Sequence, residues 1–171
     1  MGGAGGHMAH LSEDLTLTFS DIINILAEVA SADIEVTEKV DGQNLFLTVD
    51  DSGAIRTARN NSDINKGGMT TEEYASKWKG HPAESAFMSG FEAIGRAMDN
   101  MTFEDLQDIF DGGSRWLNME IMYPGNPNII NYGAAYVVLH GLASADPEAE
   151  DAFNTLVSHL NEAQVEVEGE N

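Results

Sequence analysis

The sequence predicts an α+β fold in which an antiparallel sheet is accompanied by helices that are grouped along the chain. Alternating apolar and polar residues, typical of strands, occur at 34–39, 45–49 and 54–59, with turn signals between them. Helical patterns then follow one another over about 71–110 without an intervening strand pattern. Grouped strands and grouped helices indicate an α+β protein rather than an alternating parallel fold.

The first part of the chain predicts a helix followed by a meander. Apolar residues at helical spacing predict a helix over 19–31, with Thr18 or Ser20 as the residue that caps its first turn. The three strand patterns predict an antiparallel meander over 34–59, because short polar turns separate them. A polar, glycine-rich loop is expected over 60–70.

After this loop the pattern is helical, returns to strands and ends in a helix. The final helix is expected to begin at Asp146-Pro147, with proline at its favoured first position. The expected elements are helices over about 71–79, 82–99 and 102–110, strands over 116–122 and 135–140, and a helix over about 146–164.

Length and composition predict one globular domain. We expect it over 19–164, after a glycine-rich N-terminal arm over 1–18 and before an acidic tail over 165–171. No apolar run approaches the roughly 20 residues of a membrane helix, so no membrane partner is expected. The absence of cysteine excludes disulfides and thiolate metal sites. These features favour a cytoplasmic protein, in the host cytoplasm if the gene is viral.

Charge is the unusual feature of the composition. Eight basic residues stand against 29 acidic ones, for a formal net charge of −21, and all eight lie between Lys39 and Arg115. A protein that grips many phosphates carries an excess of lysine and arginine, so a clamp around a long duplex is not expected. Two interpretations remain open and are compatible: a solvated acidic surface, and positive charge concentrated near one anionic ligand.

The segment Thr37-Glu-Lys-Val-Asp-Gly-Gln-Asn44 carries the most chemical information. It resembles the Lys-x-Asp-Gly motif of covalent nucleotidyltransferases, the superfamily of ATP-dependent RNA and DNA ligases and mRNA-capping enzymes. Alternation places Lys39 and Asp41 on one face of the expected strand, and Gly42 permits a tight turn that brings the backbone close to a nucleotide.

Three downstream segments resemble further elements of the same superfamily. Thr57-Ala-Arg-Asn60 resembles its Ser/Thr-x-Arg-Asn/Gly element, and Leu117 to Gly125 resembles its glutamate strand, which Pro-Gly follows in phage-type RNA ligases. Ala135 to His140 resembles its apolar strand. The four elements occur in family order, and Glu-Lys-x-Asp-Gly-x-Asn is closest to phage-type RNA ligases. The resemblance implies an antiparallel-sheet nucleotidyltransferase (adenylation-domain) fold, here partial.

The resemblance also implies a reaction. The Lys39 amine would attack the α-phosphorus of ATP, release pyrophosphate and hold AMP as a phosphoramidate before its transfer to a nucleic-acid 5′ end. The amine must be unprotonated, although a free lysine has a pKa of about 10.4. Neighbouring positive charge lowers that pKa. Mg²⁺ is the expected companion ion, because it bridges nucleotide phosphates.

Five other residues take nucleotide-binding roles by resemblance. Glu38 would lie near the adenine, and Asn44 would help to position the nucleotide. Arg59 would contact the ribose or a phosphate, Glu120 would accept a hydrogen bond from a ribose hydroxyl, and Tyr136 would face the base. ATP is expected rather than GTP, and RNA rather than DNA as the nucleic-acid partner of a full-length parent.

The sequence departs from the superfamily after its apolar strand. No Lys-x-Lys strand follows, since nothing after Arg115 is basic, and no clear Glu-Gly-x-Val strand for a metal ion is present. A shortened or divergent member is therefore expected, and residues 1–171 alone should adenylylate themselves poorly or not at all. The alternative is a non-catalytic nucleotide-binding or phage structural protein that retains a truncated ligase-like fold.

Overall fold

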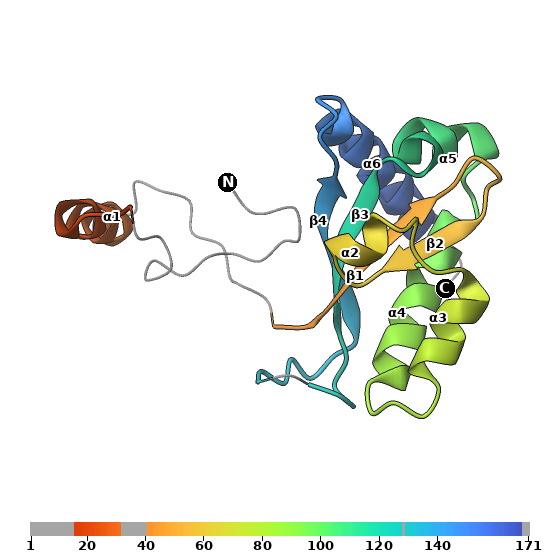
Figure 1. Ribbon diagram of the computed structural model, residues 1–171, viewed down its shortest axis with the longest axis horizontal. Coiled ribbons are helices and arrows are strands. Elements are labelled where there is room, and N and C mark those ends of the chain that lie inside the picture. Colours follow the sequence, from red (N-terminus) through yellow and green to blue (C-terminus); the bar gives the residue numbers. More distant parts are fainter. Residues whose placement is uncertain (1–15, 32–40, 128, 169–171) are drawn as a thin grey trace. The chain divides into compact units, whose positions relative to one another are not determined.

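The computed structural model describes residues 16–31, 41–127 and 129–168 (Figure 1). Contacts divide the chain into two compact units, Met1–Val40 and Asp41–Asn171. In the first unit, α1 (Phe19–Ser31) begins after Thr18, whose side chain accepts a hydrogen bond from the Asp21 amide at 3.2 Å. The helix predicted over 19–31 is confirmed, and of the two caps left open, Thr18 and Ser20, the structure shows Thr18.

The second unit contains a four-stranded antiparallel sheet with the order β2-β1-β3-β4, which confirms the α+β class. Side chains of β1 and β3 are buried on both faces of the sheet, which explains why these two strands occupy its centre. The strand predicted over 34–39 lies outside the described residues. The meander predicted over 34–59 is wrong in its pairing, because β1 lies between β2 and β3. The strands are β1 (Gln43–Val49), β2 (Ile55–Ala58), β3 (Trp116–Met122) and β4 (Tyr136–Ala143).

Five α-helices accompany the sheet in the described part of the second unit, and a 3₁₀ turn over Asp111–Gly113 precedes β3. Thr70 and Thr102 each form a capping box with an acidic residue three positions later, which explains where the second and fourth of these helices begin. The helices are α2 (Asn61–Ile64), α3 (Thr71–Trp78), α4 (Glu84–Met98), α5 (Phe103–Phe110) and α6 (Ala149–Glu168).

Two of these helices differ from the prediction. The loop expected over 60–70 contains α2, because the Asn60 side chain accepts a hydrogen bond from the Asp63 amide and caps a short helical turn. Helix α6 begins at Ala149 rather than at Pro147. The Asp146 carboxylate and carbonyl accept the amides of Glu148 and Ala149, so a capped turn occupies the predicted first positions.

One face of the sheet and the helices enclose the main core. Leu45, Leu47 and Val49 of β1 point to the same side as alternate residues of β3, and Tyr74, Phe87, Ile94 and Leu156 of the helices pack there. Figure 1 shows α3 and α4 running together beside the sheet. The second face of the sheet is therefore the side on which polar side chains can gather.

Stability should depend on pH through hydrogen-bonded aspartates, of which Asp50 is the clearest case. Its carboxylate accepts hydrogen bonds from the Ser52 hydroxyl at 2.6 Å and from Arg56 Nε at 2.8 Å, and these lower its pKa in the folded state. A depressed folded pKa stabilises the protein above the unfolded value of about 3.9, and this stabilisation is lost as the pH falls below it.

Asp50→Asn should accordingly destabilise the protein at pH 7, and the difference from wild type should shrink as the pH falls through 4 toward 2. Urea unfolding at a series of pH values measures this. The matched control is Asp99→Asn, at the exposed C-terminal cap of α4. A difference for Asp50→Asn that is the same at every pH would contradict the assignment.

Candidate functional site

The face of the sheet opposite the main core divides into an apolar and a polar part. Phe46, Ala58 and Trp116 pack together on it, with Ile64 of α2 against them. Nearer the first residues of β1, alternate positions carry polar side chains. These polar side chains are Asn44 of β1, Asn118 and Glu120 of β3, and His140 of β4.

Glu120 is at the centre of this polar part. Its Oε1 accepts a hydrogen bond from the Gly42 amide at 2.6 Å, and its Oε2 lies 3.1 Å from His140 Nε2. The Glu120 and His140 side chains are 17% and 35% exposed, so the pair is reachable from solvent. Because each carboxylate oxygen has two lone pairs, Glu120 can still accept a hydrogen bond from a ligand.

Asn44 supports Glu120 from the neighbouring strand. It lies directly opposite Glu120 in the β1–β3 register. Its Nδ2 donates to Asn118 Oδ1 at 2.7 Å and to the Met119 carbonyl at 3.3 Å. These bonds hold the amide against β3 with its own Oδ1 still able to accept.

A β-bulge aims His140 at Glu120. Met119 pairs with Leu139 and Asn118 pairs with Gly141, so His140 is an extra residue in β4. Bulges re-aim side chains and are found beside functional sites. No role was predicted for His140, and the glycine that follows it inside a strand was the available signal.

Gly42 is needed for close packing. A Cβ atom here would lie 2.6 Å from the Ile121 carbonyl oxygen, 2.6 Å from Met122 Sδ and 2.8 Å from Glu120 Cγ. Gly42 does not adopt a positive φ, so the tight turn expected from the sequence does not explain the glycine. The backbone amide reaches Glu120 only because no side chain separates the two segments.

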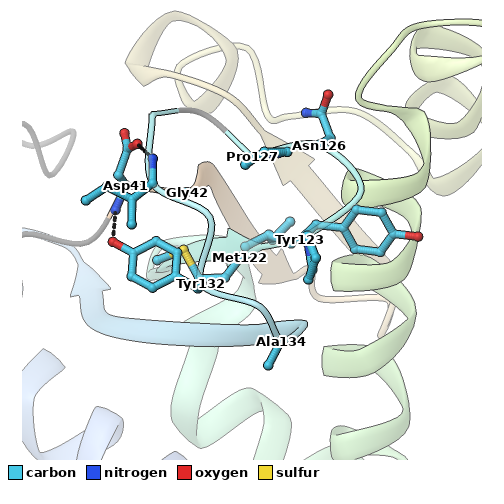
Figure 2. Close-up of a pocket in the computed structure, with 11 residues that line it drawn as sticks. Asp41, Gly42, Met122, Tyr123, Asn126, Pro127, Tyr132 and Ala134 are labelled. Atoms are coloured by element: carbon cyan, nitrogen blue, oxygen red, sulfur yellow. Dashed lines mark hydrogen bonds between the residues drawn. The ribbon is translucent and has the colours of Figure 1, made fainter.

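Asp41 organises the loop between β3 and β4. Its Oδ2 accepts hydrogen bonds from the amides of Ile129 at 2.6 Å and Ile130 at 3.0 Å, and its own amide donates to the Tyr132 hydroxyl at 3.0 Å. Tyr132 in turn contacts Tyr136 edge to face, at 5.9 Å between ring centres. Asp41 and the loop enclose a small pocket (Figure 2). Its lining is Asp41, Gly42, Ile121, Met122, Tyr123, Pro124, Asn126, Pro127, Ile130, Tyr132 and Ala134.

Arg59 lies away from these residues. Its guanidinium carbon is 4.4 Å from the centre of the Phe87 ring and 5.7 Å from that of Trp78, and both rings belong to the main core. Because Ala58 faces the opposite side of the sheet, alternation directs Arg59 to the helix side. The structure brings Asp41, Gly42, Asn44, Glu120 and Tyr136 to one region and leaves Arg59 out of it; Glu38 and Lys39 lie outside the described residues.

The described polar residues provide one basic group beside Glu120, the His140 imidazole. Within this part of the chain no lysine or arginine contacts Glu120, since Arg56 and Arg115 pair with aspartates elsewhere. The same residues contain no group of three histidine, aspartate or glutamate side chains able to hold a metal ion.

Comparisons with known proteins add no relative to the geometry described above. No protein-family model, no curated protein and no solved structure matches the chain. Among the described helices, none has the length and apolar character required to cross a membrane.

Proposed function

We propose that the chain is an ATP-dependent nucleotidyltransferase of the polynucleotide (RNA) ligase type, with an adenylation-domain fold, which forms lysyl-AMP at Lys39. The observation that carries this proposal is the hydrogen bond from the Gly42 amide to Glu120. It joins the Lys-x-Asp-Gly segment to the glutamate strand across 78 positions of sequence. Two motif elements that resemblance alone had related are thus in direct contact.

In this proposal each residue near Glu120 has a definite task. Glu120 accepts a ribose hydroxyl with its remaining lone pairs, while the Gly42 amide and His140 hold its carboxylate in place. Asn44 presents its carbonyl oxygen beside it, and Tyr136, 40% exposed, offers its ring to the base. Asp41 holds the adjoining loop through the amides of Ile129 and Ile130.

The formation of lysyl-AMP requires only Lys39 and ATP as reactants. The lone pair of Lys39 Nζ forms a bond to the α-phosphorus of ATP, the bond from that phosphorus to the bridging oxygen breaks, and pyrophosphate leaves. The ammonium proton is released to water. Mg²⁺ would enter with the nucleotide phosphates, which it bridges. The AMP would then pass to the 5′ end of a nucleic-acid strand, which we propose to be RNA.

Intact-mass spectrometry after incubation with ATP and Mg²⁺ tests the proposal. We expect a slow, substoichiometric AMP adduct, because the missing lysine strand should cost about a thousandfold in rate. The adduct should disappear in Lys39→Ala and be absent when GTP replaces ATP. It should persist in the control variant Lys79→Ala, which removes an exposed lysine that follows α3. An adduct that survives Lys39→Ala would contradict the proposal, and no adduct after prolonged incubation would favour nucleotide binding without chemistry.

A second candidate is a nucleotide-binding or phage structural protein without chemistry. The position of Arg59 on the helix side and the lack of a described lysine or arginine beside Glu120 favour it. It predicts ATP binding, measured by calorimetry, that Glu120→Ala weakens at least tenfold while no adduct forms. ATP binding unaffected by Glu120→Ala would exclude this candidate.

A further inference from the structure

Positive charge is concentrated in one short stretch of this acidic protein. Residues 56–79 contain five of the eight basic residues and three of the 29 acidic ones. This stretch runs from β2 through α2 to the first residue after α3, and it carries a net positive charge on a chain whose net charge is −21.

Three basic side chains surround the buried ring of Trp78. The Arg59 guanidinium carbon is 5.7 Å from the centre of this ring, and Lys77 Nζ is 5.6 Å from it. The His81 ring is 5.0 Å away, edge to face. Its Nδ1 accepts the Ala83 amide at 3.1 Å, so its Nε2 carries the proton and can donate to a ligand. We call Arg59, Lys77 and His81 the basic patch.

The cations of this patch are only partly neutralised. Asp63 Oδ2 lies 3.7 Å from Lys77 Nζ and accepts the backbone amide of Arg59, and its charge also acts on the Arg59 guanidinium. No hydrogen-bond acceptor among the described residues contacts that guanidinium. Burial lowers the pKa of Arg59 from its ordinary value. A guanidinium held on two aromatic rings without an acceptor is an arrangement that an anion would complete.

Two buried donors without acceptors belong to Arg59 and Trp78. In the described part of the chain, Arg59 Nη1 and Trp78 Nε1 are buried and have no hydrogen-bond partner, and Trp78 is 7% exposed. Because an unsatisfied buried donor costs about 1–3 kcal/mol, these two indicate a missing acceptor beside the basic patch.

We propose that the basic patch binds a phosphate group of a single-stranded nucleic acid. Lys77 and His81 are exposed and Arg59 is partly exposed, and all three lie within 5.7 Å of the centre of the Trp78 ring. Trp78 is too buried to stack on a base and serves as the platform beneath the cations. Recognition is therefore of the backbone and independent of sequence. At 0.15 M salt, charges farther than about 8 Å are largely screened, so the acidic remainder of the chain does not prevent it.

The inference rests on the proposed function for naming the strand as RNA, whereas phosphate binding itself does not require Lys39. The proposed site places the RNA chain beside β2, α2 and α3, where the Arg59 side chain lies. Arg59 would then contact a phosphate of the acceptor strand, a different role from the ribose or nucleotide contact that the sequence implied.

Fluorescence anisotropy with a labelled 12-nucleotide single-stranded RNA, titrated with the full chain at salt concentrations from about 50 to 150 mM, tests the patch. Arg59→Gln and Lys77→Gln should each weaken binding about fivefold and reduce the slope of log K against log salt by about 0.7. Arg96→Gln, at an exposed position of α4 outside the patch, makes the same charge change and should have little effect. Arg59→Lys should retain part of the affinity, and circular dichroism should show that each variant is folded.

Two further measurements show whether the bound phosphate belongs to RNA or to ATP, and whether phosphate binding is independent of the chemistry at Lys39. ATP, titrated under the same conditions, should bind equally to wild type and Arg59→Gln. ATP binding that depends on Arg59, together with RNA binding that does not, would show that the basic patch holds a nucleotide and not an RNA chain. RNA binding that Arg96→Gln weakens as much as Arg59→Gln does, or that is absent at 50 mM salt, would also overturn the proposal. Lys39→Ala should abolish the AMP adduct and leave RNA binding intact, so failure of one proposal is distinguishable from failure of the other.

Discussion

Replacing Arg115 by methionine is expected to lower the free energy of unfolding by about 3 kcal/mol. Arg115 is the most completely buried cation of the described residues, with its side chain 8% exposed. Its Nε donates to Asp146 Oδ2 at 2.8 Å, its Nη2 bonds to the same oxygen, and its Nη1 donates to the Asp108 carbonyl at 2.7 Å. Methionine keeps much of the volume and leaves these acceptors without a donor.

Arg115 holds together elements that the sheet alone would not connect. The Asp108 carbonyl belongs to the last turn of α5, Arg115 precedes β3, and Asp146 precedes α6. Urea unfolding measures the loss, and Arg96→Met on exposed α4 is the control, expected within about 0.5 kcal/mol of wild type. A loss no larger than that of the control would show that the buried ion pair contributes nothing net.

Replacing Gly42 by alanine should both destabilise the protein and disrupt the residues around Glu120. The new Cβ would lie 2.6 Å from a backbone oxygen, that of Ile121, which cannot move as a flexible side chain can. Overpacking of this kind costs about 1–3 kcal/mol, which for a chain of this size lowers Tm by about 2–4 °C per kcal/mol. Separation of the two segments would also break the bond from the Gly42 amide to Glu120.

Thermal unfolding measures the first effect and ATP titration the second, which we expect to weaken at least tenfold. Gly95→Ala is the matched control, since a Cβ there meets nothing within 4 Å and alanine favours a helix interior over glycine by about 1 kcal/mol. ATP affinity unchanged in Gly42→Ala would show that nucleotide does not bind beside Glu120.

Much of the fold was predictable because the relevant information is local. Strand 116–122 was predicted with the bounds that β3 has, and α3, α4 and α5 began within two residues of expectation. Alternation over β3 and the threonines that cap α3 and α5 are properties of neighbouring residues. The helix α2 was missed because a single side-chain bond, from Asn60 to the Asp63 amide, turns a polar loop into a helical turn.

The site was predictable only in part. Gly42 and Glu120 were named from motifs, and their contact is a consequence of the β1–β3 register, which places Asn44 opposite Glu120. Arg59 was expected beside them. Successive side chains of a strand point to opposite faces of the sheet, so a shift of one position moves a residue to the other face. Ala58 faces the polar side, and Arg59, the next residue, therefore faces the helices.

Periodicity, capping residues and composition thus established the α+β class, the order of the elements and the scarcity of positive charge, since each depends on residue type and short spacing. Tertiary structure alone decided which charges meet. The bulge that turns His140 toward Glu120, the close approach that only Gly42 allows and the gathering of Arg59, Lys77 and His81 around Trp78 all join residues from different elements. Strand register and helix packing set these distances, and neither is encoded in the spacing of residues along the chain.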